Sequence, residues 1–289
     1  LTANEALREE LRLALKGISD LERLTNRLLV GKAGPRDLLG LRASLEIIPQ
    51  IQQLIEHIPS LAALIKTMHA CEDVCDHTTR ALTDDPPAVL NTIGAIRPGY
   101  AQELDDILNA TREARDWIAN LEPQERRRTG IASIKVGFNK VFGYYIEISH
   151  ANVGKVPTDY IRKQTLVNAE RYITPELKEY ETLVLNAEEE ILAVERRLYE
   201  ELCREIGQAA PRLLQTARAV AHLDVFLSLA DVATREGYIR PTLSDDDLLV
   251  VKDGRHPVVE RLLDGGTRYI PNDTHFDSMS RLHIITGPN

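Results

Sequence analysis

The eight residues Leu282 to Asn289, LHIITGPN, could begin a phosphate-binding loop. Four of the first five are apolar or β-branched and run into Gly-Pro, which predicts a short buried strand, Leu282 to Thr286, and then a turn. In the full pattern, G-x-x-x-x-G-K-S/T, backbone N–H groups bind the phosphates, the lysine reaches the outer phosphates and the hydroxyl holds Mg²⁺. Only its first three positions are present, and an ordinary strand-to-turn connection is the alternative.

A second set of residues with possible metal chemistry lies in the stretch HACEDVCDH. His69, Cys71, Cys75 and His77 are residue types that ligate zinc. The surrounding residues 60–82 carry a continuous helical pattern, and a helix places both cysteines on one face without bringing both histidines round to complete a tetrahedron. We therefore interpret the cysteines as packed thiols, and a metal site is the alternative. Three cysteines in the chain are an odd, sparse set that suits a reducing compartment.

Basic residues gather in the segment from Ile131 to Pro175. This segment has a net charge of +3, whereas the whole chain has a formal net charge of −9. Its basic residues are Lys135, Lys140, Lys155, Arg162, Lys163 and Arg171. A basic segment in an acidic chain favours contact with the phosphates of a polyanion, which is independent of sequence and sensitive to salt. A solvated surface without a ligand is the alternative.

The elements that must position these residues are mainly helices. Aromatic residues make up only 5% of the chain, which favours helix over sheet. Up to residue 128 the pattern is helical and is broken by Gly and Pro. The last and longest helix of this part is expected after Pro98-Gly99, and Pro123 is expected to kink or end it.

A second long helix is predicted from residue 176 to 206. Thr174 can cap it, Pro175 suits its first position, and apolar residues follow at steps of three and four from Leu177 to Ile206. A further helix, rich in Ala and Leu, is expected to continue to about Glu236.

The sequence between the two long helices predicts a small sheet. Residues 131–149 are rich in β-branched and aromatic residues that alternate on both sides of a glycine-containing turn, which indicates a β-hairpin. Gln164 to Asn168 is a candidate third strand. The helices would then run out and back as a lever with the sheet at its far end. An ordinary α+β domain with a β insertion is the alternative.

The remaining residues indicate an α/β domain of which only the beginning is present. Short strand-like pieces follow residue 242 and lead to LHIITGPN. No apolar run approaches the roughly 20 residues that span a bilayer, and the amino terminus lacks the pattern of a signal peptide. We therefore expect a cytoplasmic protein with no membrane partner. A chain that starts on leucine and stops inside an incomplete loop is expected to be a piece of a longer gene product.

Six stretches, in this order, match one family: KVGFNKVFGYYIEIS, QTLVNAERYITPELKEYE, AHLDVFLSLADVA, GRHPVVE, YIPND and ITGPN. Through them the chain resembles, over essentially its whole length, the MutS DNA mismatch-repair proteins in their bacterial form. The resemblance implies a mainly α fold, with a helical core and long antiparallel lever helices, a small inserted β clamp domain, and the first strands of a truncated α/β P-loop ATPase domain. The implied domains are core and outgoing lever 1–130, clamp 131–188, returning lever helices 189–242 and the start of the ATPase domain 243–289.

The resemblance also implies contacts with DNA. Asn139 and Asn168 match positions that hydrogen-bond the DNA backbone in the family. Their neighbours by charge and proximity complete a set that we call the predicted DNA-contact residues: Asn139, Lys140, Lys163, Gln164, Thr165, Asn168 and Arg171. Amide groups of Asn and Gln donate to phosphate oxygens, while Lys and Arg displace counter-ions.

A partial nucleotide site is implied at Tyr269, Ile270, Gly287, Pro288 and Asn289. The first two match positions that pack on adenine, although they could simply be core of the partial domain, and the last three would begin the phosphate cradle. His256, in GRHPVVE, is interpreted as structural because no nucleophile is present for it to serve. Without the P-loop lysine and the later catalytic groups the chain is not expected to hydrolyse ATP, although the intact parent is expected to be a DNA-dependent ATPase that uses ATP and Mg²⁺.

The predicted function is therefore clamping of duplex DNA without sequence preference, and transmission of the DNA-bound state to the ATPase domain. In the parent, the implied partners are mismatch-containing duplex DNA, a second copy of the chain and a downstream protein of the MutL type. The alternative is a structural helical arm of another hairpin-bearing ATPase, with a tip that binds protein. The basic tip and the match over residues 137–149 favour DNA.

Overall fold

The computed structural model describes residues 1–263, 268–285 and 287. The chain separates into two compact units, Leu1–Asp231 and Val232–Asn289. The first unit begins with a body of short helices: α1 (Glu5–Lys16), α2 (Leu21–Leu29), α3 (Pro35–Glu46), α4 (Ile48–Ile55), the 3₁₀-helix η1 (Pro59–Leu61), α5 (Ala62–Ile65) and α6 (Glu72–Ala81). Glycine and proline set several of these boundaries as predicted, since Gly17 caps the end of α1 and Pro35 is the first residue of α3.

Three long helices follow: α7 (Gln102–Thr129), α8 (Pro175–Gly207) and α9 (Ala210–Glu236). The predicted start of α8 is confirmed, because Thr174 Oγ1 accepts a hydrogen bond from the backbone N–H of Leu177 at 3.0 Å and Pro175 is the first helical residue. Pro123 does not end α7, which continues to Thr129.

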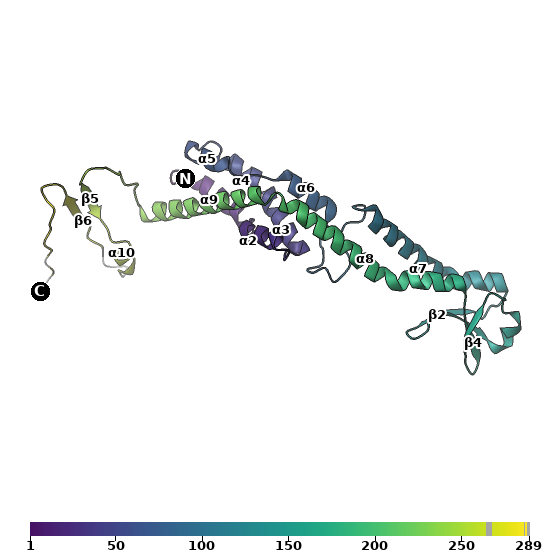
Figure 1. Cartoon of the computed structure of the whole chain (residues 1–289). Helices are drawn as coiled ribbons and strands as arrows, with labels where there is room; N and C mark the ends of the chain where they lie inside the picture. The colour runs from purple at the N-terminus through teal and green to yellow at the C-terminus, as the bar shows by residue number, and fades with distance from the viewer. Residues whose placement is uncertain (264–267, 286, 288–289) are drawn as a thin grey trace. The chain divides into compact units, whose positions relative to one another are not determined.

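Helices α7 and α8 lie side by side and antiparallel (Figure 1). Glu103, near the start of α7, forms an ion pair with Arg197, far along α8. Trp117 lies further along α7 and stacks on Tyr180, near the start of α8, with ring centroids 4.3 Å apart. The contact nearer the start of α7 is the one farther along α8, so the two helices run in opposite directions. The chain therefore runs out along α7 and back along α8, as predicted.

A four-stranded antiparallel sheet lies at the far end of this helix pair (Figure 1). Its strands are β1 (Lys135–Asn139), β2 (Gly143–Ser149), β3 (Ile161–Thr165) and β4 (Ala169–Ile173), in the order β1-β2-β4-β3, and the 3₁₀-helix η2 (His150–Lys155) follows β2. The predicted hairpin is confirmed as β1 and β2.

The predicted third strand, Gln164 to Asn168, is wrong in its position. β3 ends at Thr165, and residues 166–168 form the turn into β4, in which the N–H of Leu166 donates to the carbonyl of Ala169 at 2.8 Å. A β-bulge between Arg162 and Gln164 breaks the alternation of side chains that would have marked β3 in the sequence.

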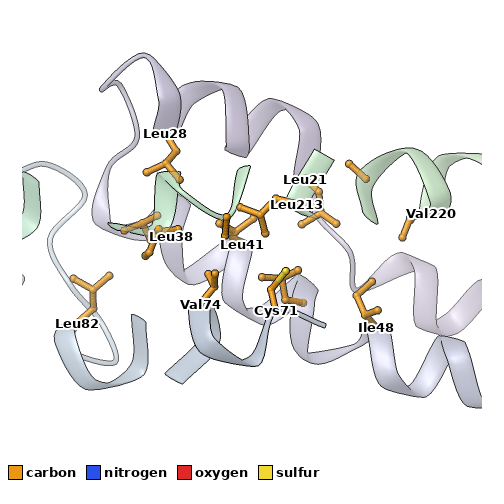
Figure 2. Packing of buried hydrophobic residues seen from close by; sticks show 14 of the residues in the cluster. Leu21, Leu28, Leu38, Leu41, Ile48, Cys71, Val74, Leu82, Leu213 and Val220 are labelled. Carbon is orange, nitrogen blue, oxygen red and sulfur yellow. The ribbon is translucent and has the colours of Figure 1, made fainter. Parts of the chain in front are cut away.

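Two separate hydrophobic cores hold the first unit together. The larger core lies in the helical body, where side chains such as Leu38, Leu41 and Leu213 interlock (Figure 2). The smaller core joins the sheet to the helix pair and contains Ile118, Leu121, Ile131, Ile134, Ile146, Ile148, Tyr160, Tyr172 and Leu177. The apolar stripe of α8 contributes to both, with Leu177 in the smaller core and Ile191 to Ile206 in the larger, although Leu183 is exposed.

The continuous helix expected over residues 60–82 is wrong. The chain leaves α5 after Ile65 and enters α6 only at Glu72. Cys71 precedes α6 in the left-handed conformation, with φ of 49°. Its thiol is buried in the larger core (Figure 2). The prediction of a packed thiol therefore holds for Cys71, although the predicted continuous helix around it is wrong.

The second unit contains a two-stranded sheet of β5 (Leu249–Gly254) and β6 (Asn272–Phe276), and the short helix α10 (Val259–Leu262). The predicted buried strand, Leu282 to Thr286, is wrong over its described residues 282–285, which are neither in a strand nor buried. A buried strand needs hydrogen-bonded neighbours on its edges and cover on its faces, and in the described chain β5 and β6 pair only with each other.

Candidate nucleic-acid interface

The predicted DNA-contact residues lie on two turns at opposite ends of the clamp sheet and on the strands between them. Asn139 and Lys140 belong to the β1–β2 turn, which enters β2 at Gly143. The far end of β2, Ser149, pairs with Ala169 beside the β3–β4 turn, which follows Thr165 at the end of β3 and includes Asn168. Since a strand of seven residues is roughly 20 Å long, this is about the separation of the two turns.

The β1–β2 turn is fixed by the side chain of Asn139. Its Oδ1 accepts hydrogen bonds from the N–H of Val141 at 2.8 Å and of Phe142 at 3.3 Å. Its Nδ2 has no protein partner among the described residues, and so remains available to an external acceptor. Lys140 is exposed beside it. The turn therefore presents one amide donor and one ammonium group to solvent.

A buried carboxylate on α8 holds the same turn from behind. Glu181 is only 2% exposed, and its Oε2 accepts from the N–H of Tyr144 at 2.9 Å. Gly143 has φ of +79°, and a Cβ at that position would lie 2.4 Å from the Glu181 carboxylate oxygens. Lys178, with Nζ 2.5 Å from Oε1, balances the charge of the carboxylate. Only glycine fits this approach of strand to helix.

The β3–β4 turn is held by His150. Its Nε2 lies 2.9 Å from the carbonyl oxygen of Leu166, and its backbone N–H donates to the carbonyl of Asn168 at 3.2 Å. The side chains of Thr165 and Asn168 are exposed and make no hydrogen bond within the described chain. This turn therefore also presents polar groups to solvent from a fixed backbone.

Lys163 lies in the β-bulge of the edge strand β3 and is exposed. The clamp cations that form no ion pair with any described residue are Lys135, Lys140, Lys155 and Lys163. The arginines differ, because Arg162 lies 3.5 Å from Glu170 and Arg171 is paired. Lysine side chains therefore supply the free positive charge of the clamp.

Arg171 and Gln164 are brought together, but by contacts within the protein. Arg171 Nε donates to Glu147 Oε2 at 3.0 Å and Nη1 to Gln164 Oε1 at 3.1 Å, while its guanidinium lies 4.0 Å from the centre of the Tyr145 ring. A guanidinium with these three partners ties β2, β4 and β3 together. Of the seven predicted residues, these two have side chains engaged across the sheet.

Two carboxylates on α7 attach the sheet to the helix pair. Glu122 Oε2 accepts from the N–H of Val136 on the edge strand β1 at 3.0 Å. Glu125 is buried and accepts from Tyr160 Oη at 2.7 Å and from Arg128 Nε at 2.8 Å. Burial, and then the hydrogen bond to Glu125, raise the pKa of Tyr160 well above its usual value.

The sequence did not point to Glu122, Glu125 or Glu181 as members of the interface. Each is one glutamate among many on charged helices, and spacing along a helix does not reveal which of them meets a strand. The one available signal was Gly143, whose position after a turn indicates close approach of another group.

The partial nucleotide site is not assembled by the described residues. Tyr269 is half-buried, Ile270 is 78% exposed, and both precede β6 outside regular structure. Gly287 is exposed, whereas Pro288 and Asn289 lie outside the described residues. His256 Nδ1 accepts from the N–H groups of Val258 and Val259 at 3.3 and 3.2 Å, which gives it a role at the start of α10.

The candidate zinc ligands diverge. His69 Nε2 lies 2.9 Å from Gln215 Oε1, and His77 Nε2 lies 2.9 Å from the hydroxyl of Tyr100. Burial, with Glu46 and Cys71 nearby, raises the pKa of Cys75 to about 11. Among the described residues, no three or more His, Cys, Asp or Glu side chains gather in a way that would hold a metal ion.

Within residues 1–263, 268–285 and 287, no helix combines the length and apolar character needed to cross a bilayer.

Residues 99–190, which include α7, the sheet and the first half of α8, match the family described as MutS family domain IV.

Curated relatives extend the similarity over the whole chain. The DNA mismatch repair protein MutS of Salinibacter ruber is 45% identical over 289 residues, which cover 99% of this chain and 32% of the relative. The proteins of the same name from Pelotomaculum thermopropionicum and Methanosarcina barkeri are 47% and 43% identical, with all of this chain and 34% and 33% of those relatives covered. The chain thus spans about a third of the length of the curated relatives it matches.

Proposed function

Because the chain is homologous to DNA mismatch repair protein MutS over its whole length and contains the family's domain IV, we propose that its sheet clamps duplex DNA through the phosphate backbone. The contacts are assigned to Asn139 and Lys140 on one turn and to Thr165 and Asn168 on the other, with Lys163 beside the second turn. The α7–α8 pair then transmits the DNA-bound state towards the body.

The observation that carries this proposal is the pair of rigid turns with unpaired donors. Amide, hydroxyl and ammonium groups are donors that suit phosphate oxygens, and none of these five side chains is neutralised by an acid in the described chain. Because successive phosphates of one strand are about 3.4 Å apart along the duplex axis, turns roughly 20 Å apart are far enough apart to contact separate phosphates.

The test is a salt titration of duplex binding by the full chain. Each lost phosphate contact should flatten the slope of log K against log salt by about 0.9, so Lys140→Ala and Lys163→Ala should each show this change on every DNA sequence. Matched and mismatched duplexes should bind alike, because phosphates look alike at every base pair. Unchanged slopes in both variants would instead favour the arm whose tip binds protein.

Arg171→Ala separates the two roles within the clamp. If Arg171 mainly ties the strands together, this variant should loosen the sheet, measured by faster amide exchange in β3 and β4. If Arg171→Ala changed the slope of log K against log salt as much as Lys140→Ala does, and amide exchange in β3 and β4 stayed unchanged, Arg171 would be assigned to the phosphate contacts instead.

The remaining proposals concern the whole protein of which this chain covers a third. We assign to it a P-loop ATPase activity that depends on ATP and Mg²⁺, action in the cytoplasm on mismatched DNA as a pair of copies, and a downstream partner of the MutL type. The 289-residue chain itself should bind ATP weakly and show no turnover, because Tyr269 alone leaves the phosphates without a cradle. ATP hydrolysis above background by the purified chain would overturn this assignment.

A further inference from the structure

Both turns of the clamp sheet expose apolar side chains at their tips. Val141 and Phe142 on the β1–β2 turn are 80% and 54% exposed, and Val167 on the β3–β4 turn is 92% exposed. None of the three belongs to either hydrophobic core. Each turn thus combines an asparagine, a nearby lysine and a valine that folding leaves in water.

Polar contacts hold the backbone that carries the apolar side chains of the first turn. The N–H groups of Val141 and Phe142 both donate to Asn139 Oδ1, and the next residues are fixed against Glu181. A backbone held in this way keeps the Cα–Cβ bonds of both residues in fixed directions, so a ligand need not order the turn itself on binding.

The size and spacing of these groups indicate what covers them. A stable protein interface buries roughly 800 Å² on each partner around a continuous apolar centre. Here the apolar groups are one or two side chains on each turn, separated by roughly 20 Å and flanked by cations and amide donors. A DNA backbone alternates anionic phosphates with the C–H surfaces of deoxyribose, which fits small apolar groups set beside phosphate donors.

We propose that Val141, Phe142 and Val167 pack on deoxyribose next to the phosphates contacted by Lys140 and the asparagines. This inference rests on the proposed DNA clamp and adds to it a contact that does not depend on salt. Apolar contact releases no counter-ions, so its share of the affinity persists at high salt, where the electrostatic share is lost.

The test compares intercepts and slopes in a salt titration of the full chain with duplex DNA. The double variant Val141→Ser/Phe142→Ser should bind roughly fivefold to tenfold more weakly at every salt concentration, with the wild-type slope. Val167→Ser should give a smaller parallel shift of about twofold to threefold. Lys140→Ala should change the slope instead.

The matched control is Leu185→Ser, since Leu185 is a 52% exposed apolar residue on α8 outside both turns and should leave affinity and slope unchanged. Protection of the Tyr144 amide from exchange confirms that the turn stays folded in each variant. Wild-type affinity of the double variant, beside a changed slope for Lys140→Ala, would overturn the deoxyribose contact and leave the clamp standing. Loss of self-association with intact DNA binding would likewise overturn it, in favour of a contact between copies.

Discussion

Replacing Gly143 with alanine should loosen the β1–β2 turn from α8. Two costs add at this position. A residue with a side chain at φ of +79° costs about 1–2 kcal/mol of conformational free energy relative to glycine. The new Cβ would also lie 2.4 Å from the Glu181 carboxylate, which must move away and release the N–H of Tyr144, at a further cost of about 1–3 kcal/mol.

Gly130→Ala is a matched control within the same part of the chain. Gly130 caps α7 with φ of +70°, and a Cβ there would meet nothing within 4 Å. It therefore carries the backbone cost alone. The difference between the two variants isolates the carboxylate contact, whose 1–3 kcal/mol corresponds to roughly a 5- to 150-fold difference in an equilibrium constant.

The assay is native-state hydrogen exchange of the Tyr144 amide, the donor to Glu181. In Gly143→Ala this amide should exchange faster than in Gly130→Ala by roughly that 5- to 150-fold factor, while amides of the larger core keep their protection. If the Tyr144 amide exchanges at the same rate in both variants, the carboxylate does not hold the turn.

Three further predictions concern the helical body. Because its pKa is raised from 9.0 to about 11, the Cys75 thiol should hold roughly 100-fold less thiolate at pH 8 than an unperturbed cysteine and react correspondingly slowly with DTNB until the chain is unfolded; fast labelling in the native state would contradict the burial. Glu195→Ala should cost about 2–4 kcal/mol in the urea unfolding free energy, because the buried Glu195 carboxylate accepts from the N–H groups of Gly94, Ala95 and Ile96; a loss below about 1 kcal/mol would show that the loop finds other acceptors. The hydrogen bond from Arg212 lowers the pKa of Asp73, so this exposed pair should contribute at most about 1 kcal/mol above about pH 4 and lose it as pH falls through the lowered pKa. Asp73→Asn should therefore be less stable than wild type at pH 6, and the difference in urea unfolding free energy should shrink as the pH is lowered below about 4; a difference that stays the same at every pH would refute this origin.

The sequence predicted those elements whose signals are local. Thr174 and Pro175 mark the start of α8 because capping acts within one turn of helix, and the hairpin of β1 and β2 follows from side-chain alternation around a glycine turn. The break in the helix before Cys71 was not predicted, because nothing in the sequence marks a cysteine that adopts the left-handed conformation. The same limit applies to β3, whose bulge removes the alternation that a strand should show.

The candidate interface could be predicted only in part, because contacts between strands decide which side chains are free. Asn139 is half-buried at the end of β1 and Lys140 is exposed on the turn that follows, as a turn-forming sequence suggests. Arg171 has the same charge as Lys140, yet its partners Glu147 and Gln164 come from β2 and β3, whose pairing with β4 was not predicted. Net charge therefore marked the segment, and the sheet register separates its exposed, unpaired side chains from those engaged within the sheet.

The uninterrupted length of α8 has a mechanical consequence. Thirty-three residues in one helix span roughly 50 Å, and the helix begins at the clamp and ends in the larger core. Because α8 packs in the larger core from Ala187 onward, about 12 residues, roughly 18 Å, extend from that core to the clamp end. A tilt of about 4° at Ala187 displaces the clamp end by roughly 1.3 Å, which stretches a hydrogen bond of about 2.9 Å beyond its limit of about 3.2 Å. An angular change too small to disturb packing in the body would therefore move the turns by more than a hydrogen bond tolerates, and a displacement of the turns would correspond to only a small rotation in the body.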